Sequence, residues 1–206
     1  DTPTWRQRAA SPRMPVAVRL LESLRLPAPA GSTAGPGRAA GTRDAGTPVP
    51  RAAILEGLTS ASWPGRLDLR TLPDGREVLL DAAHNPSGAA SLAAYLRATG
   101  MAPLPIVFGV MRDKACDAML EALAPVATRF VFTEAATARA RPAAELPGLA
   151  RAAGLGTPCE AVARPVDALA AAWRFARRIC VCGSIFLVGD VLEAGVGLEP
   201  EAEGQG

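Results

Sequence analysis

Short apolar runs alternate with stretches of helical periodicity over the last two thirds of the chain. The runs that indicate strands are Val78–Asp81, Pro105–Phe108, Phe130–Phe132, Cys159–Ala163 and Cys180–Gly183. The spacing of apolar residues predicts helices over Ser87–Thr99, Ala115–Ala124, Pro142–Ala153, Val166–Arg177 and Ser184–Glu193. This alternation is typical of an α/β fold, with a mostly parallel sheet that helices cover on both faces. One hairpin is expected before it, pairing Leu67–Leu72 with Glu77–Asp81 through the turn Pro73-Asp74-Gly75.

The first fifty residues have a different character. Val16–Leu26 has helical spacing, and we interpret residues 1–26 as the remaining helix of a preceding domain. Residues 27–50 are rich in Pro, Gly, Ala, Thr and Ser and predict a flexible linker. We therefore expect one α/β domain over residues 51–193, opening with a short helix at Arg51–Thr59, and a disordered tail over residues 194–206.

Composition excludes several classes of function. The net charge of +2 gives no strong field for nucleic acid or an anionic membrane, so neither is an expected partner. No apolar run approaches the ~20 residues that span a bilayer, and we expect a cytoplasmic protein. The four cysteines form no C-x-x-C pair, which favours free thiols over a zinc or redox site. Cys180 and Cys182 alternate within an apolar run, and we expect them to face opposite sides of a strand. No metal site is expected in this chain.

The only histidine follows a strand end, in the run Asp81-Ala-Ala-His84-Asn85. Open α/β sheets bind their ligands where parallel strands end. A carboxylate after an apolar strand needs a partner, which is a ligand or the backbone of the next helix. His84 and Asn85 offer N–H donors for a phosphate or a carboxylate, although a lone histidine often has a structural role.

Further polar residues stand at other predicted strand ends. Arg66 follows the rigid Trp-Pro-Gly turn and is suited to phosphate oxygens, or is simply solvated. Asp113 and Lys114 follow the strand Pro105–Phe108 and can form a simple surface ion pair. Ser184 follows the last strand, where it can cap a helix or touch an anion. These residues are expected to share one sheet edge with Asp81 and His84.

Four segments in this order resemble the carboxy-terminal domain of folylpolyglutamate synthase and dihydrofolate synthase, members of the Mur-ligase superfamily. They are Trp63–Leu67, Asp81–Pro86, Gly109–Lys114 and Val181–Gly189, and the resemblance covers about Ala52 to Leu192. It implies ATP-dependent amide formation between a folate carboxylate and L-glutamate through an acyl phosphate. It places Arg66 at the phosphates and Asp81 at the nucleoside of ATP. His84, Asn85, Asp113, Lys114 and Ser184 are placed near the phosphate and the incoming glutamate, with His84 and Asp81 as the catalytic pair.

The sequence departs from that family in one large respect. The family's amino-terminal ATPase domain carries a Gly-Lys-Ser phosphate loop and the Mg²⁺ ligands, and this sequence contains neither. We therefore expect no ligation by this chain alone and a need for an ATPase domain, in cis or as a separate chain. The acceptor, folate or dihydropteroate, is left open. Two alternatives remain: a non-catalytic nucleotide- or amino-acid-binding module, and a degenerate remnant without a ligand.

Overall fold

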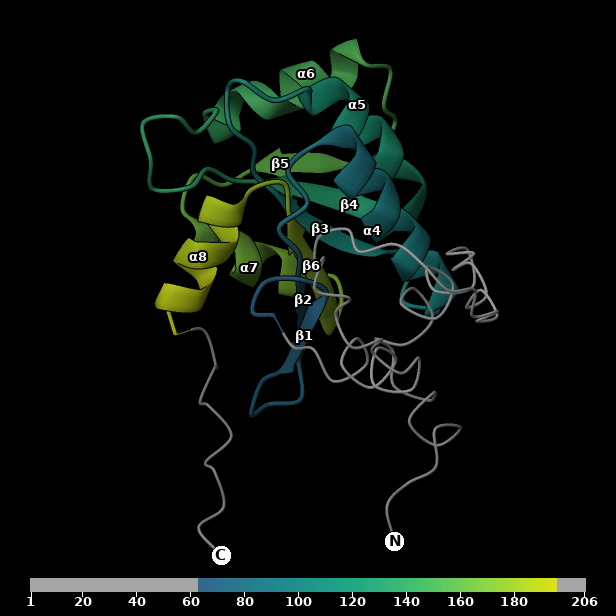
Figure 1. Cartoon of the computed structure of the whole chain (residues 1–206), viewed down its shortest axis with the longest axis vertical. Coiled ribbons are helices and arrows are strands. Elements are labelled where there is room, and N and C mark those ends of the chain that lie inside the picture. Colours follow the sequence, from purple (N-terminus) through teal and green to yellow (C-terminus); the bar gives the residue numbers. More distant parts are fainter. Residues whose placement is uncertain (1–62, 196–206) are drawn as a thin grey trace, which may run out of the picture. The chain divides into compact units, whose positions relative to one another are not determined.

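The computed structural model describes residues 63–195, and these form an α/β layered unit (Figure 1). Its elements are β1 (Asp68–Thr71), β2 (Glu77–Leu80), α4 (Pro86–Ala98), β3 (Leu104–Phe108), α5 (Cys116–Leu123), β4 (Ala127–Phe132), α6 (Leu146–Ala152), β5 (Cys159–Ala161), α7 (Pro165–Trp173), β6 (Arg178–Cys182) and α8 (Ile185–Glu193). Short 3₁₀ turns, η1 (Ala124–Val126) and η2 (Ala143–Glu145), precede β4 and α6. The expected helices at 16–26 and 51–59, the linker and the tail lie outside the described residues, apart from residues 194 and 195.

One six-stranded sheet carries the fold, in the order β1-β2-β6-β3-β4-β5. The hairpin strand β1 is antiparallel to β2, and every other pairing is parallel. The predicted α/β class with a mostly parallel sheet is thus confirmed. The last of the described strands, β6, lies between β2 and β3, pairing Leu79 with Cys180 on one side and Val107 with Val181 on the other.

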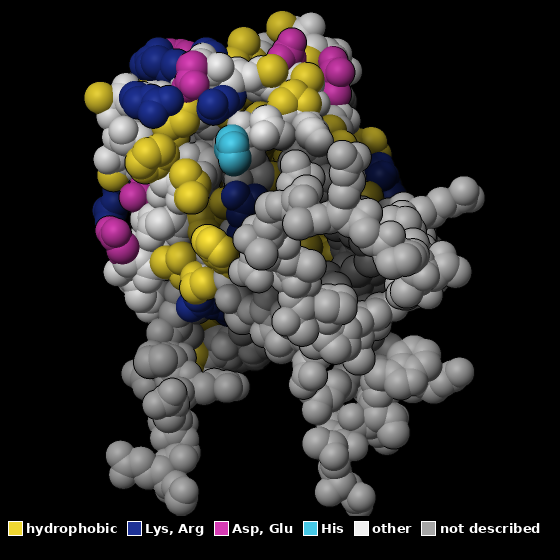
Figure 2. Space-filling view, in the orientation of Figure 1, with side chains coloured by type: hydrophobic (Ala, Val, Ile, Leu, Met, Phe, Trp, Pro, Cys, Tyr) yellow, Lys and Arg dark blue, Asp and Glu magenta, His cyan; other side chains and the backbone are white. Residues whose placement is uncertain are grey.

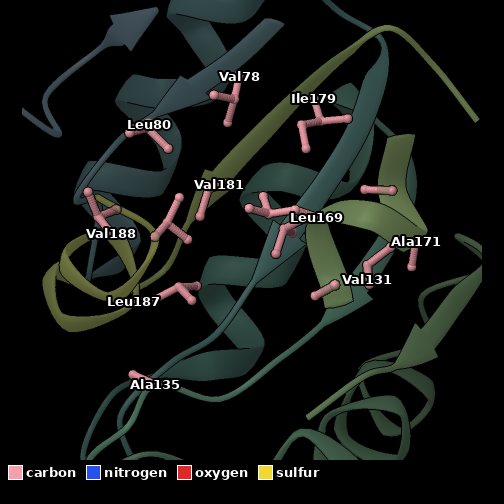
Figure 3. Packing of buried hydrophobic residues seen from close by; sticks show 14 of the residues in the cluster. Val78, Leu80, Val131, Ala135, Leu169, Ala171, Ile179, Val181, Leu187 and Val188 are labelled. Atoms are coloured by element: carbon pink, nitrogen blue, oxygen red, sulfur yellow. The ribbon is translucent and has the colours of Figure 1, made fainter. Parts of the chain in front are cut away.

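Helices cover both faces of the sheet, with α7 and α8 on one side and α4 and α5 on the other (Figure 1). On the first side, branched side chains from the strands meet small and branched residues of the two helices (Figure 3). They include Val78, Leu80, Val107, Val131, Ile179 and Val181 from the sheet, and Leu169, Ala172, Leu187 and Val188 from α7 and α8. Side chains alternate across a strand, so the intervening residues face α4 and α5.

The second face carries three phenylalanines from neighbouring strands. Phe130 and Phe132 stack with ring centroids 5.5 Å apart, and Phe108 meets both rings edge-on. All three are fully buried, and each such ring stabilises the fold by about 1.5–3 kcal/mol through removal from water. These aromatic side chains fix the packing of β3 on β4.

Two predicted helices differ in extent. The segment Pro142–Ala153 divides into η2 and α6, because Pro147 has no N–H to continue a helix and instead occupies the first turn of α6. The helix expected to reach Arg177 ends at Trp173, after which the N–H groups of Arg174 and Phe175 bond three residues back. The chain then turns into β6.

The cysteine prediction needs one correction. Because residues two apart on a strand share a face, Cys180 and Cys182 lie on the same side of β6 and not on opposite sides. Their thiols hydrogen-bond to each other, and this bond, with burial, raises the pKa of Cys182. All four cysteines are free, although Cys159 is only half-buried.

Candidate functional site

The parallel strands β2, β6 and β3 end side by side, at the point where the strand order reverses around β6. Residues that follow these strands therefore meet at one edge of the sheet. Backbone bonds join the three ends: Gly183 N–H donates to the Ala83 oxygen at 2.9 Å, and Gly109 N–H to the Cys182 oxygen at 3.2 Å. This edge brings together the segments of Asp81 and Ser184, as the sequence predicts.

The turn Trp63–Leu67 presents Arg66 beside this edge. Gly65 has a φ of +74°, and a β-carbon there would lie 2.6 Å from Cγ1 of Val188 on α8, so only glycine fits. Its N–H donates to the Asp68 carboxylate at 3.1 Å, and its oxygen accepts the N–H of Ala82 at 2.8 Å. A turn fixed in this way holds the exposed Arg66 guanidinium on a defined backbone.

Asp81 lies beneath that turn and is only 7% exposed. Its Oδ1 accepts the N–H of Ala83 and its Oδ2 accepts the N–H of Leu67, each at 2.9 Å. Burial raises the pKa of this carboxyl, and the two backbone N–H groups and the charge of Arg66 counteract the rise. The carboxylate is therefore part of the structure of the edge.

His84 is half-buried at the same strand end, and Figure 2 shows the histidine, in cyan, at the surface. Its Nδ1 lies 2.9 Å from the oxygen of Ala82. A carbonyl oxygen only accepts, so Nδ1 carries the proton. Nε2 is then available to a ligand, as an acceptor when the ring is neutral and as a donor when it is charged.

Asn85 and Ser184 each begin a helix. Asn85 Oδ1 accepts the N–H of Gly88 at 2.8 Å and caps α4, and Ser184 Oγ accepts the N–H of Phe186 at 3.1 Å and caps α8. Asn85 is exposed, so its amide nitrogen is open to solvent, whereas Ser184 is 1% exposed. Both helices point their positive ends to the sheet edge, a setting that favours anions.

Asp113 and Lys114 form a second charged group with Arg139, which is not among the site residues predicted from the sequence. Lys114 Nζ lies 3.1 Å from Asp113, and Arg139 donates to both carboxylate oxygens at 3.3 and 3.4 Å. The bond from Lys114, more than the charges, lowers the pKa of Asp113. Asp113 is exposed and Lys114 is half-buried, which matches the surface ion pair considered from sequence.

Arg139 reaches this group because two loops pair beyond the sheet. Arg112 N–H donates to the Arg139 oxygen at 3.0 Å and Arg141 N–H to the Val110 oxygen at 2.9 Å. The Arg141 side chain donates to the Arg112 oxygen at 3.0 Å. Open α/β sheets bind their ligands where parallel strands end, and this holds for β4 as it does for β2 and β3. Applied to β4, it indicates the arginines in the loop after Phe132.

Apolar side chains lie next to Arg66. Trp63 and Ile185 are 75% and 58% exposed. A pocket beside the turn is lined by Trp63, Pro64, Gly65, Arg66, Ala82, Ile185, Val188, Gly189 and Leu192. Within residues 63–195, no helix has the length and apolarity needed to cross a bilayer, and no three His, Cys, Asp or Glu side chains gather as a metal would require.

Comparison with known proteins gives consistent matches. The family model described as Mur ligase, glutamate ligase domain, matches residues 65–188. The probable bifunctional folylpolyglutamate synthase/dihydropteroate synthase of Halobacterium salinarum is 36% identical over 142 residues, which is 67% of this chain and 17% of that protein. The dihydrofolate synthase/folylpolyglutamate synthase of Mycobacterium tuberculosis is 38% identical over 104 residues, which is 50% of this chain and 20% of that protein.

Solved structures agree with these matches. Folylpolyglutamate synthase of Mycobacterium tuberculosis, complexed with ADP and AMPPCP, superposes with a TM-score of 0.63 and 28% identity, over 74% of this chain and 36% of that one. The Thermotoga maritima folylpolyglutamate synthase gives a TM-score of 0.58 and 32% identity, over 71% and 34%. The chain thus spans about a third of the solved proteins that it matches.

Proposed function

Since this chain belongs to the Mur ligase family, as a glutamate ligase domain, we propose that it forms the glutamate-binding half of a folylpolyglutamate or dihydrofolate synthase. The reaction would join L-glutamate to the carboxylate of a folate or dihydropteroate at the expense of ATP. The observation that carries the proposal is the meeting of Arg66, His84 and Ser184 at one sheet edge, around the buried carboxylate of Asp81.

The proposed chemistry has two steps. The γ-phosphoryl group of ATP passes to an oxygen of the acceptor carboxylate, and ADP leaves. The amine of glutamate then attacks the carbonyl carbon, phosphate leaves with the carbon–oxygen bond electrons, and the nitrogen loses a proton. No protein nucleophile is needed, so the domain would act by positioning and by stabilising negative charge.

Each side chain of the edge has a role in this proposal. Arg66 would hold phosphate oxygens in a bidentate fork, and Asp81 would lie toward the nucleoside. His84, through the free Nε2, and the exposed amide of Asn85 would contact phosphate oxygens beside the positive ends of α4 and α8. Lys114, held by its ion pair with Asp113, would attract a carboxylate of the incoming glutamate.

ATP and Mg²⁺ fit this edge only in part. Arg66 and the positive ends of α4 and α8 suit phosphate. Among the described residues, however, no three His, Cys, Asp or Glu side chains lie close enough together to bind a metal ion. Mg²⁺, when bound, would shield the charge of the ATP phosphates. We propose that its ligands and a phosphate loop belong to an ATPase domain in the same polypeptide or in a second chain.

A complementation assay tests this function. ADP release would be measured with ATP, glutamate and either acceptor, using this chain alone, an ATPase domain of a folylpolyglutamate synthase alone, and both together or fused. We expect glutamate-dependent release only when both are present, and its loss in Arg66→Ala and His84→Ala. ADP release by this chain alone would contradict the need for a second domain. Failure of the mixture and the fusion, with weak nucleotide or glutamate binding in calorimetry, would favour a binding module instead.

A further inference from the structure

The turn that carries Arg66 contains a backbone conformation that needs support. Leu67 has a φ of +46°, in the left-handed region that side chains with a β-carbon rarely adopt. Such a conformation persists only where the surroundings hold it in place. Leu67 directly follows Arg66, so relaxation of Leu67 would move the guanidinium.

The support comes from the far side of the hairpin. Asp81 Oδ2 accepts the N–H of Leu67 at 2.9 Å, across 14 positions of sequence. The neighbouring bond from Ala82 N–H to the Gly65 oxygen, at 2.8 Å, ties the other side of Arg66 to the same strand end. Arg66 is therefore bracketed by two bonds to the segment that also carries His84.

A carboxylate is required for this arrangement. Both oxygens of Asp81 accept backbone N–H groups, from Leu67 and from Ala83. An asparagine has the same shape but only one acceptor, so its NH₂ group would face one of these N–H donors. A buried donor left without an acceptor is costly, and the turn or the strand end would have to move.

We propose that Asp81 is a positioning residue that fixes Arg66 through the backbone N–H of Leu67, and so sets the phosphate-binding arginine relative to His84. This role is separate from any contact of Asp81 with a nucleoside. Only the identity of the ligand that Arg66 binds rests on the proposed function.

Backbone NMR of the full chain tests the positioning without any ligand. In Asp81→Asn we expect the Leu67 amide peak to move and its hydrogen exchange to accelerate by about tenfold, together with a shift of the Arg66 Nε signal. Asp190→Asn is the matched control. Asp190 accepts a single N–H, from Ala136 at 2.7 Å, which an amide oxygen can also accept, so Leu67 and Arg66 should keep their signals. Unchanged Leu67 and Arg66 signals in Asp81→Asn would overturn the proposal.

Binding of inorganic tripolyphosphate separates this role from a nucleoside contact, because tripolyphosphate has no sugar or base. We expect Asp81→Asn to weaken binding about tenfold, Arg66→Ala to weaken it similarly, and the double variant to be no weaker than Arg66→Ala alone. Normal tripolyphosphate binding by Asp81→Asn, with weaker ADP binding, would overturn the proposal in favour of a nucleoside contact. Absence of any binding by the wild type would instead contradict the phosphate role of Arg66, and the NMR comparison would still decide the positioning.

Discussion

The carbonyl oxygen of Gly109 occupies the space that a β-carbon on Gly183 would need. The ends of β3 and β6 thus touch backbone to backbone, and the ring of Phe108 closes the same gap, 2.9 Å from that position. Gly183 also has a φ of +105°, which side chains with a β-carbon rarely adopt. The close approach lets the residues after these strands share one edge.

Gly183→Ala should therefore lower the free energy of unfolding by about 3 kcal/mol, from steric overlap and backbone strain together. Urea unfolding followed by circular dichroism measures this. Gly189→Ala is the control, because Gly189 lies inside α8 with no neighbour within 4 Å of the added carbon. It should stabilise the fold by up to about 1 kcal/mol. Equal effects at the two positions would contradict the packing described here.

Asn85 allows stability and anion binding to be separated. Asn85→Ala should cost about 1 kcal/mol, because the N–H of Gly88 loses its cap. Asn85→Asp should keep that stability, since a carboxylate accepts the same N–H and the first turn of α4 has no other acid. The added negative charge should nevertheless weaken tripolyphosphate binding, measured by calorimetry. Tighter binding by Asn85→Asp would exclude Asn85 from the anion site.

The cysteines should differ in reactivity. Burial raises the pKa of Cys116 to about 11, although the charge of Arg141 opposes the rise. Cys180 and Cys182 are fully buried. Cys159 is half-buried. Since the thiolate is the reactive form, a disulfide reagent near neutral pH should modify Cys159 quickly in the folded chain and all four thiols in urea. In Cys159→Ser the fast phase should disappear, and its persistence would contradict the described burial.

Asp81 should also influence stability as the pH changes. Burial raises the pKa of the Asp81 carboxyl above the ordinary 3.8. The N–H groups of Leu67 and Ala83 and the charge of Arg66 oppose this rise but do not cancel it. A carboxyl that holds its proton more tightly when folded stabilises the fold most below that ordinary value, and loses this contribution as the pH rises through the folded pKa. The unfolding free energy of the wild type minus that of Asp81→Asn should therefore fall with rising pH and then level off.

Urea unfolding of both chains from about pH 3 to pH 8 measures this difference. The exposed Asp74 and Asp113, whose pKa values are lowered by bonds to Arg76 and Lys114, titrate in both proteins and cancel. A difference that grows with pH would show that the bonds to Leu67 and Ala83 outweigh burial at this carboxylate.

Much of the fold follows from local pattern. The alternation of apolar runs with helical spacing predicts the α/β class, and the rule for parallel strand ends brings Asp81, His84 and Ser184 together. The pattern does not predict the strand order, because apolar strands such as Val78–Leu80 and Ile179–Val181 look alike before pairing. The central place of β6 depends on packing across the whole sheet.

The finer details of the site also depend on residues far apart in sequence. The bond from Leu67 to Asp81 spans 14 residues and that from Arg139 to Asp113 spans 26, so neither leaves a local signature. The sequence indicates a ligand contact for Asn85, and a helix cap or an anion contact for Ser184. In the structure both side chains cap helices, and the exposed amide of Asn85 can still contact a ligand.

The position of β6 has a consequence for synthesis on the ribosome. This strand is the last of the described chain to be translated, yet both of its neighbours, β2 and β3, come before it by many residues. Until Arg178–Cys182 leaves the exit tunnel, β2 and β3 have no strand between them and cannot form the parallel pairs seen here. The sheet edge where β2, β6 and β3 end therefore forms only after nearly all of this domain has been translated, and a nascent chain that stalls earlier exposes unpaired strand edges to other chains.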